Sequence, residues 1–141
     1  LGWRYLGGPR FVLRTALARY PGVHTLICLH HHPLPIGSAW MDGMVLENGP
    51  ELIDLAAAHA QVKAILFGHV HQVVDRVHRG IRLLASPSTC VQFAPDLDKF
   101  GVDHAAPGMR WLVLTPQGEI RTGIERLDAV PSTIDLRSTG Y

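Results

Sequence analysis

The sequence predicts an α/β fold, a layered sheet that carries polar residues at the ends of its strands. A helical segment, a short apolar segment and a histidine cluster follow one another in residues 9–32 and again in residues 48–71. From residue 73 onward the chain consists mainly of short apolar segments joined by tight turns. Alternating helices and buried strands are typical of sheets that bind ligands beyond the carboxyl ends of their strands.

The first helix is expected in residues 11–20, where apolar side chains recur at helical spacing. Pro9 suits its first turn, and the Pro-Gly pair at residues 21–22 ends it. Residues 23–29 form a short, mostly apolar segment that is typical of a strand buried on both faces. Residues 33–46 are expected to be a loop.

A second helix is expected after Asn48 and Gly49, with Pro50 in its first turn. It leads into a buried strand over residues 62–67. The later strands are expected at residues 73–77, 81–85, 110–114 and 120–127, with turns at residues 79–80 and 117–118. These four strands predict a mainly antiparallel second sheet layered on the first. The residues after 128 lack periodicity, so residues 129–141 are expected to be a poorly ordered tail that follows residues 1–128.

The composition indicates a globular protein with an unusual number of histidines. The chain has 141 residues, of which 47% are hydrophobic, and this is enough for one core. A net charge of +1 is too small to indicate a nucleic-acid or membrane surface, and no apolar segment reaches the roughly 18 residues of a membrane span. Cys28 and Cys90 are expected to be buried, reduced thiols of a cytosolic protein. The nine histidines gather mostly in two clusters.

Gly68-His69-Val70-His71 follows the buried strand at residues 62–67. In extended chain, side chains two residues apart project to the same side, so His69 and His71 are expected to face one pocket. Gly68 allows the backbone to pass close to a bound group. Two polar residues at a loop entry are the alternative interpretation, but a second histidine cluster at another strand end favours a metal site.

That second cluster is His30-His31-His32, which stands between an apolar segment and Pro-Leu-Pro. Alternation places His30 and His32 on one side and His31 on the other. One or two of the three are therefore expected to bind a metal. The others are expected to orient ligands or to touch substrate.

The segments HHHPLP (residues 30–35), GHVH (68–71) and SPSTCVQF (86–93) are similar to motifs of the calcineurin-like metallophosphoesterases. They most resemble the bacterial class III 3′,5′-cyclic-AMP phosphodiesterases. The resemblance extends over about residues 21–127. It implies a layered αββα sandwich of which this chain is roughly the C-terminal half, in a cytoplasmic enzyme.

The resemblance also implies roles for single histidines. In that family a histidine three places before Pro-Leu-Pro binds the second of two metal ions, which matches His30, with His31 as the competing choice. His69 matches a ligand of the same ion. His71 matches the ligand of the first ion, close to the substrate phosphate, and is the candidate catalytic residue.

Three further side chains are expected around these ligands. His31 and Trp40 are expected on the substrate side, and His32 is expected to orient the ligands from behind. For Trp40 there are two interpretations, stacking on the adenine of the substrate or simple packing of the loop.

The family's Asp-x-His, Gly-Asp and Gly-Asn-His motifs do not occur in this chain. Two divalent ions bring about four positive charges together, which bridging carboxylates offset and neutral imidazoles do not. The acids nearest in sequence are Asp42, expected to be a solvated loop residue, and Asp75, expected to be a charge on a strand surface. The chain is therefore expected to be a fragment that lacks the carboxylate side of its site.

The complete protein is expected to hydrolyse 3′,5′-cyclic AMP to 5′-AMP with a hydroxide held between two ions of iron, manganese or zinc. Its partner is then a small cyclic nucleotide, with no role for nucleic acid or membrane. A second enzymatic interpretation changes the substrate to a glycerophosphodiester or another phosphodiester. A third is a non-catalytic module that binds one metal through His30, His69 and His71. Neither the metal nor the oligomeric state follows from the sequence.

Overall fold

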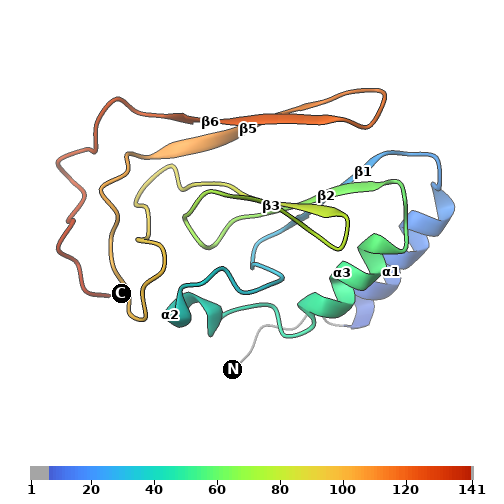
Figure 1. Cartoon of the computed structure of the whole chain (residues 1–141), viewed down its shortest axis with the longest axis horizontal. Helices are drawn as coiled ribbons and strands as arrows, with labels where there is room; N and C mark the ends of the chain where they lie inside the picture. Colours follow the sequence, from blue (N-terminus) through green and yellow to red (C-terminus); the bar gives the residue numbers. More distant parts are fainter. Residues whose placement is uncertain (1–6, 141) are drawn as a thin grey trace.

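The computed structural model describes residues 7–140, with side chains from residue 12 onward, so the side chain of Phe11 lies outside the described residues. Three layers are stacked in Figure 1: two helices, a four-stranded sheet and a long β-hairpin. The elements are α1 (Gly7–Arg19), β1 (Thr25–Leu29), α2 (Ala39–Asp42), α3 (Gly49–Ala57), β2 (Val62–Phe67), β3 (Val74–His78), β4 (Ile81–Ala85), β5 (Gly108–Leu114) and β6 (Ile120–Arg126). The predicted mixed α/β class is confirmed.

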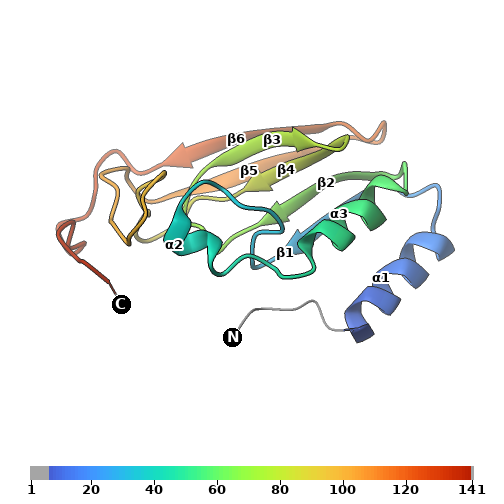
Figure 2. The same cartoon turned by 60° about the horizontal axis from the view of Figure 1, so that its bottom comes forward.

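The four-stranded sheet has the order β1-β2-β4-β3, with β1, β2 and β4 parallel and β3 antiparallel to β4. Its apolar side chains make up most of the core, and Ala64, Ile65 and Leu83 have no exposed surface. α1 and α3 cover the face of this sheet opposite the hairpin (Figure 2). Because β1 and β2 are parallel, the carboxyl ends of both strands lie on the same side of the sheet.

The predicted second sheet of four strands is wrong in part, because β3 and β4 belong to the first sheet and β5 and β6 alone form the second. β4 is apolar enough to pair with the buried β2. The tight turn at Arg79 and Gly80, with φ of 51° and 81°, then carries β3 back to the sheet edge. After β6, residues 129–140 form local turns.

A buried guanidinium joins the hairpin to the first sheet. The side chain of Arg110 in β5 is 2% exposed. It donates to the carbonyl oxygens of Ala85 and Val74, each at 2.9 Å, and to the Thr122 hydroxyl at 3.2 Å. Asp75 lies 4.0 Å away and also accepts two hydrogen bonds from Arg82. This network satisfies a buried charge and links the two β layers.

Two local predictions need correction. Residues 33–46 contain the short helix α2 and are not entirely a loop. Cys28 and Cys90 are exposed rather than buried. Cys28 lies on β1, an edge strand of the described sheet that pairs with β2 alone, so the two-sided burial expected from its apolar sequence does not arise.

α3 packs closely against the segment that follows the triple histidine. A Cβ atom added at Gly49 would lie 1.8 Å from the carbonyl oxygen of Pro33, so a glycine is needed where α3 begins. The segment of residues 33–46 is also closed by a hydrogen bond between its two ends, in which Leu46 N donates to the carbonyl of His32 at 3.0 Å. Within the described residues, no helix has the length and apolar character needed to cross a bilayer.

Candidate metal centre

The two histidine clusters follow the carboxyl ends of two neighbouring strands. β1 and β2 are parallel, and their last residues, Leu29 and Phe67, are paired in register. Gly68 N donates to the carbonyl of His30 at 3.2 Å, so the backbone pairing continues one step beyond the strands. Residues 38 positions apart in sequence are thereby brought together, as predicted for side chains at the carboxyl ends of parallel strands.

His30, His31 and His69 converge into one group. One ring nitrogen from each lies within 4.8 Å of the others. The ring centroids of His31 and His69 are 4.3 Å apart, and that of His30 lies 5.0 Å from His31 and 5.2 Å from His69. His30 is exposed, while His31 and His69 are half-buried. Both choices for the ligand within the triple histidine therefore face His69.

The backbone is not extended at the two histidine clusters, where the sequence suggested that side chains would alternate between two sides. β1 ends at Leu29, so the triple histidine lies beyond the strand, and His30 and His31 both turn toward His69. His69 and His71 have φ of 62° and 48°, in the left-handed region. The expectation that alternation in extended chain aligns His69 with His71 is therefore wrong, because neither residue has an extended backbone.

His71, predicted as a ligand and as the catalytic residue, lies beside this group and is not one of its three members. Its Nδ1 donates to the carbonyl of Val91 at 2.9 Å, because a carbonyl can only accept. Its ring stacks on Phe93, with centroids 4.2 Å apart and planes 9° apart. Nδ1 thus carries the proton, and Nε2 keeps the lone pair that a metal or a phosphate proton would need.

A buried glutamine shapes the turn that supports His71. Gln92 is 2% exposed. Its side-chain oxygen accepts from Ser88 N at 3.1 Å, and its side-chain nitrogen donates to Ser88 O at 2.7 Å. The residues on either side of it, Val91 and Phe93, are those that contact the His71 ring. Sequence reasoning missed this role of Gln92, although the residue stands in the SPSTCVQF segment.

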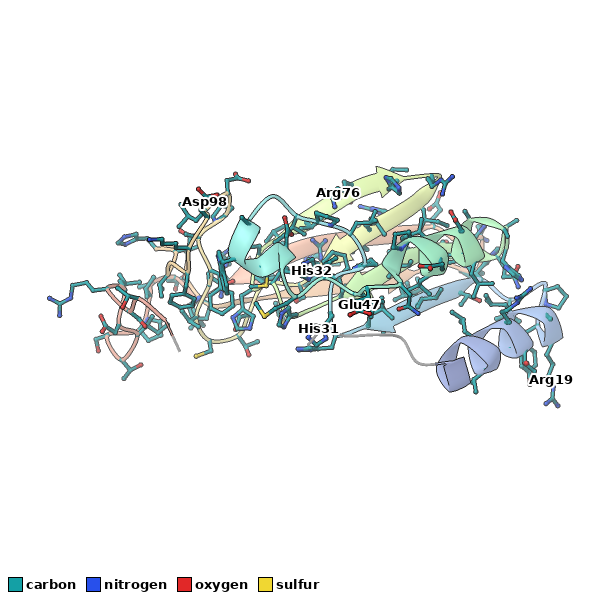
Figure 3. The ribbon with its side chains drawn as sticks, turned by 90° about the horizontal axis from the view of Figure 1, so that it is seen from below. Arg19, His31, His32, Glu47, Arg76 and Asp98 are labelled. Carbon is teal, nitrogen blue, oxygen red and sulfur yellow. The ribbon has the colours of Figure 1, made fainter. Side chains whose placement is uncertain are left out.

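His32 lies behind the convergent group. It is fully buried, and its ring is parallel to that of His69, with centroids 5.9 Å apart and planes 14° apart. Figure 3 shows His32 beside α2, and the Asp42 carboxylate at the end of that helix lies 3.5 Å from His32 Nε2. Neither ring nitrogen of His32 makes a hydrogen bond, and the same holds for the buried Nε2 of His69. Such groups are rare in folded proteins unless a ligand completes them.

Asp42 corrects a prediction. The sequence suggested a solvated loop acid, but its side chain is 21% exposed and accepts hydrogen bonds from two backbone nitrogens. Asp75, expected to be a charge on a strand surface, is exposed on β3 and paired with Arg82. The local sequence does not predict the hydrogen bonds of Asp42, because its partners are backbone nitrogens of an irregular loop.

Trp40 lies in α2, and its ring packs edge-to-face on Phe93 and Phe100, with centroids 5.3 Å apart in each pair. Phe93 is also the ring on which His71 stacks. Trp40 is therefore one aromatic ring away from the candidate catalytic histidine. Its buried Nε1 makes no hydrogen bond.

The electrostatics of the site favour neutral imidazoles. Burial, together with repulsion from His31 and other neighbouring histidines, lowers the pKa of His69 to about 4. Burial also lowers the pKa of His31, of His71 and of His32, the last despite the opposing effect of Asp42. A neutral imidazole is the form that binds a metal, so these histidines are ready to bind at neutral pH.

The donors present fit a transition metal. Three imidazoles that converge within 4.8 Å, one with a buried nitrogen that lacks a partner, suit zinc, iron or manganese rather than calcium. This convergent group of described residues contains no carboxylate. The histidines alone therefore offset none of the charge of two bound ions.

Comparisons with known proteins show which proteins the chain is similar to. No family model matches the chain. A 3′,5′-cyclic adenosine monophosphate phosphodiesterase (CpdA) of Pseudomonas aeruginosa is 48% identical over 130 residues, which cover 92% of this chain and 48% of that protein. The protein of the same name in Escherichia coli K12 is 46% identical over 92% of this chain and 47% of its own length.

A 3′,5′-cyclic-nucleotide phosphodiesterase of a Nostoc species is 40% identical over 90% of this chain and 47% of its own length. The chain thus spans about half the length of the curated relatives it matches. The similarity covers nearly all of the described structure, including both histidine clusters.

Proposed function

We propose that this chain, a member of the bacterial class III cyclic-AMP phosphodiesterases, forms the histidine side of a site that hydrolyses 3′,5′-cyclic AMP to 5′-AMP. These phosphodiesterases belong to the calcineurin-like metallophosphoesterases. The observation that carries the proposal is the convergence of His30, His31 and His69 beside His71 at one edge of the sheet. The names of the relatives supply the substrate class.

His69 is proposed as a metal ligand together with His30 or His31, and His71 as a ligand of a neighbouring ion. Two bound ions would supply an activated water and would neutralise charge that develops on the phosphoryl oxygens. Carboxylates outside the convergent group would be needed to hold two ions together. Iron, manganese and zinc are all compatible with this donor set.

His71 is proposed to work at the substrate phosphate. Its Nδ1 proton is held by the Val91 carbonyl, so its Nε2 remains unprotonated and directed away from that contact. Stacking on Phe93 restricts rotation of the ring. These two contacts hold the ring in one orientation before any ligand arrives, which lowers the entropic cost of binding.

His31 and Trp40 are proposed on the substrate side of the group. Edge-to-face contacts with Phe93 and Phe100 favour packing as the main role of Trp40. Stacking on adenine is the second candidate role. The variant Trp40→Phe separates the two, because loss of base stacking raises KM for cyclic AMP, whereas loss of packing lowers thermal stability.

The test is hydrolysis by the full-length gene product, loaded with manganese or zinc and assayed in parallel on cyclic AMP and on glycerophosphocholine. We expect 5′-AMP from cyclic AMP and a strong loss of turnover in His71→Ala. Turnover of glycerophosphocholine alone would replace the proposed substrate with a glycerophosphodiester. Stoichiometric binding of one metal without turnover of either substrate would favour a non-catalytic metal-binding module.

A further inference from the structure

Asp42 is tied to the segment that follows the triple histidine. Its Oδ1 accepts a hydrogen bond from Ile36 N at 2.7 Å, and its Oδ2 accepts one from Gly37 N at 3.0 Å. Gly37 has a φ of 100°, which is unfavourable for other residues, so this turn requires glycine at its second contact with Asp42. The carboxylate thus fixes the end of the Pro-Leu-Pro segment against α2.

The same carboxylate faces the buried ring of His32. Oδ1 lies 3.5 Å from His32 Nε2, on a ring with no exposed surface. The plane of that ring is parallel to the ring of His69, 5.9 Å away. In space, the ring of His32 therefore lies between the Asp42 carboxylate of α2 and the ring of His69 in the convergent group.

A buried ring whose two nitrogens lack hydrogen-bond partners is energetically unfavourable. An apolar ring would fill the same space without this cost. A nearby carboxylate is the feature that offsets it and that selects one orientation of an imidazole. Packing alone therefore does not explain a histidine at position 32.

We propose that Asp42 is a positioning residue for His69, which acts through the ring of His32. The carboxylate sets the plane of His32, and this plane supports His69 from behind in the orientation that faces His30 and His31. His69 needs such support because its own backbone is in the left-handed region. The inference rests on the proposed function to the extent that His69 is a metal ligand.

The first experiment measures binding of Zn²⁺ alone to the full-length gene product by calorimetry, with Asp42→Asn as the variant. We expect about a 10-fold loss of affinity, within the range found for residues that orient metal ligands. Asp98→Asn is the matched control, because it removes the same charge from an exposed side chain on another loop (Figure 3). Equal affinities of the wild-type chain and Asp42→Asn would overturn the proposal.

A double-mutant cycle tests the route through His32. In a His32→Phe background, which keeps a buried ring but removes its nitrogens, Asp42→Asn should cause no further loss of Zn²⁺ affinity. Additive losses would show that Asp42 acts through the loop alone and would overturn the proposed route. If Asp42→Asn does not fold, Asp42→Glu, which moves the carboxylate by one methylene group, takes its place in the cycle.

Nuclear magnetic resonance of the metal-free chain separates this inference from the proposed function. Asp42→Asn should shift the ring signals of His32 and His69 and leave those of the exposed His78 unchanged. If the wild-type chain binds no Zn²⁺, the proposed metal site fails, and these ring shifts alone decide the role of Asp42. Unchanged His69 signals would overturn it.

Discussion

Two buried polar clusters in this molecule have opposite character. At the interface between the sheets, the guanidinium of Arg110 donates to two carbonyls and a hydroxyl, and Asp75 accepts from Arg82. At the ends of β1 and β2, the buried nitrogens of His32 and the Nε2 of His69 have no hydrogen-bond partner. Both clusters contain titratable groups from segments far apart in sequence, yet only the first is satisfied within the described residues.

The difference indicates what each cluster is for. A satisfied polar network rigidifies a fold, because every member would lose a partner if the layers separated. Polar groups that are buried without partners lower stability and are retained where a ligand completes them. The cluster of Arg110 therefore stabilises the fold, whereas the cluster of His69 has the character expected of the proposed metal site. Four measurements test this contrast.

The largest effect is expected for Arg110→Met. The variant removes the donor that Arg110 supplies to the carbonyls of Ala85 and Val74, so the free energy of unfolding should fall by about 3 kcal/mol. Urea unfolding followed by circular dichroism gives this value, and Zn²⁺ titration of the folded variant should match the wild-type chain. A loss of Zn²⁺ affinity as large as the loss of stability would abolish the contrast between the clusters.

His69→Ala should show the reverse pattern. We expect Zn²⁺ affinity to fall by about 100-fold. A proposed ligand should matter at least as much as the residues that only orient ligands, whose loss lowers metal affinity by about 10- to 100-fold. The metal-free free energy of unfolding should change by less than about 1 kcal/mol, since the variant removes a buried nitrogen that has no partner. His78→Ala, on the exposed side of β3, is the control. Retained affinity in His69→Ala would show that the metal binds elsewhere.

The two clusters should respond to pH in different ranges. His69 has a pKa of about 4 in the folded chain against an ordinary 6.5, so below pH 6.5 the unfolded chain binds a proton that the folded chain does not. The free energy of unfolding of the metal-free chain should therefore decrease as pH falls from about 6.5 to about 4, by about 2 kcal/mol after allowance for solvent screening. The pKa of Asp75 is lowered by its hydrogen bonds to Arg82, so its contribution is lost only below about pH 3.8.

Urea unfolding in the presence of a chelator, repeated between pH 7 and pH 3, checks this difference. His69→Ala should reduce the slope between pH 6.5 and pH 4 without abolishing it, because His31, His32 and His71 shift in the same direction. Asp75→Asn should keep that slope and change the curve below it. A flat wild-type profile from pH 6.5 to pH 4 would contradict the burial argument.

The smallest effect is expected for Arg121→Ala on the hairpin. Arg121 lies 3.2 Å from Glu119, but their side chains are 71% and 63% exposed. Solvent screens such a pair, so the free energy of unfolding should change by less than about 0.5 kcal/mol. Thermal unfolding at low and high salt measures it. A change comparable to that of Arg110→Met would show that arginine on this hairpin matters irrespective of burial.

The regular elements could largely be predicted because their signals are local. Residues 62–67 and 81–85 match β2 and β4, since short apolar segments between turn residues are typical of buried strands. The turn at Arg79 and Gly80 was also expected and is confirmed. The assignment of β3 and β4 to a second sheet failed, because strand order depends on long-range pairing with β2.

Within the candidate site, the sequence indicated which histidine segments come together better than how their side chains are arranged. The two histidine clusters were expected at strand ends, and the parallel register of β1 and β2 brings them together. Their directions were not predictable, because His69 and His71 leave the extended conformation in which side chains alternate. Asp42 was missed, because its partners are backbone nitrogens of a loop and a ring made accessible only by folding.

The sequence by itself determined the α/β class, the strands of the core and the presence of a histidine-rich edge, since each of these depends on residue type and short-range spacing. The tertiary structure decided that His30 and His31 both face His69, that the Asp42 carboxylate lies 3.5 Å from the buried ring of His32, and that Arg110 joins the layers. These features depend on contacts between residues separated by 10 to 39 positions in the sequence. Hydrogen bonds and packing between such segments, rather than local propensity, set the directions of side chains outside regular elements.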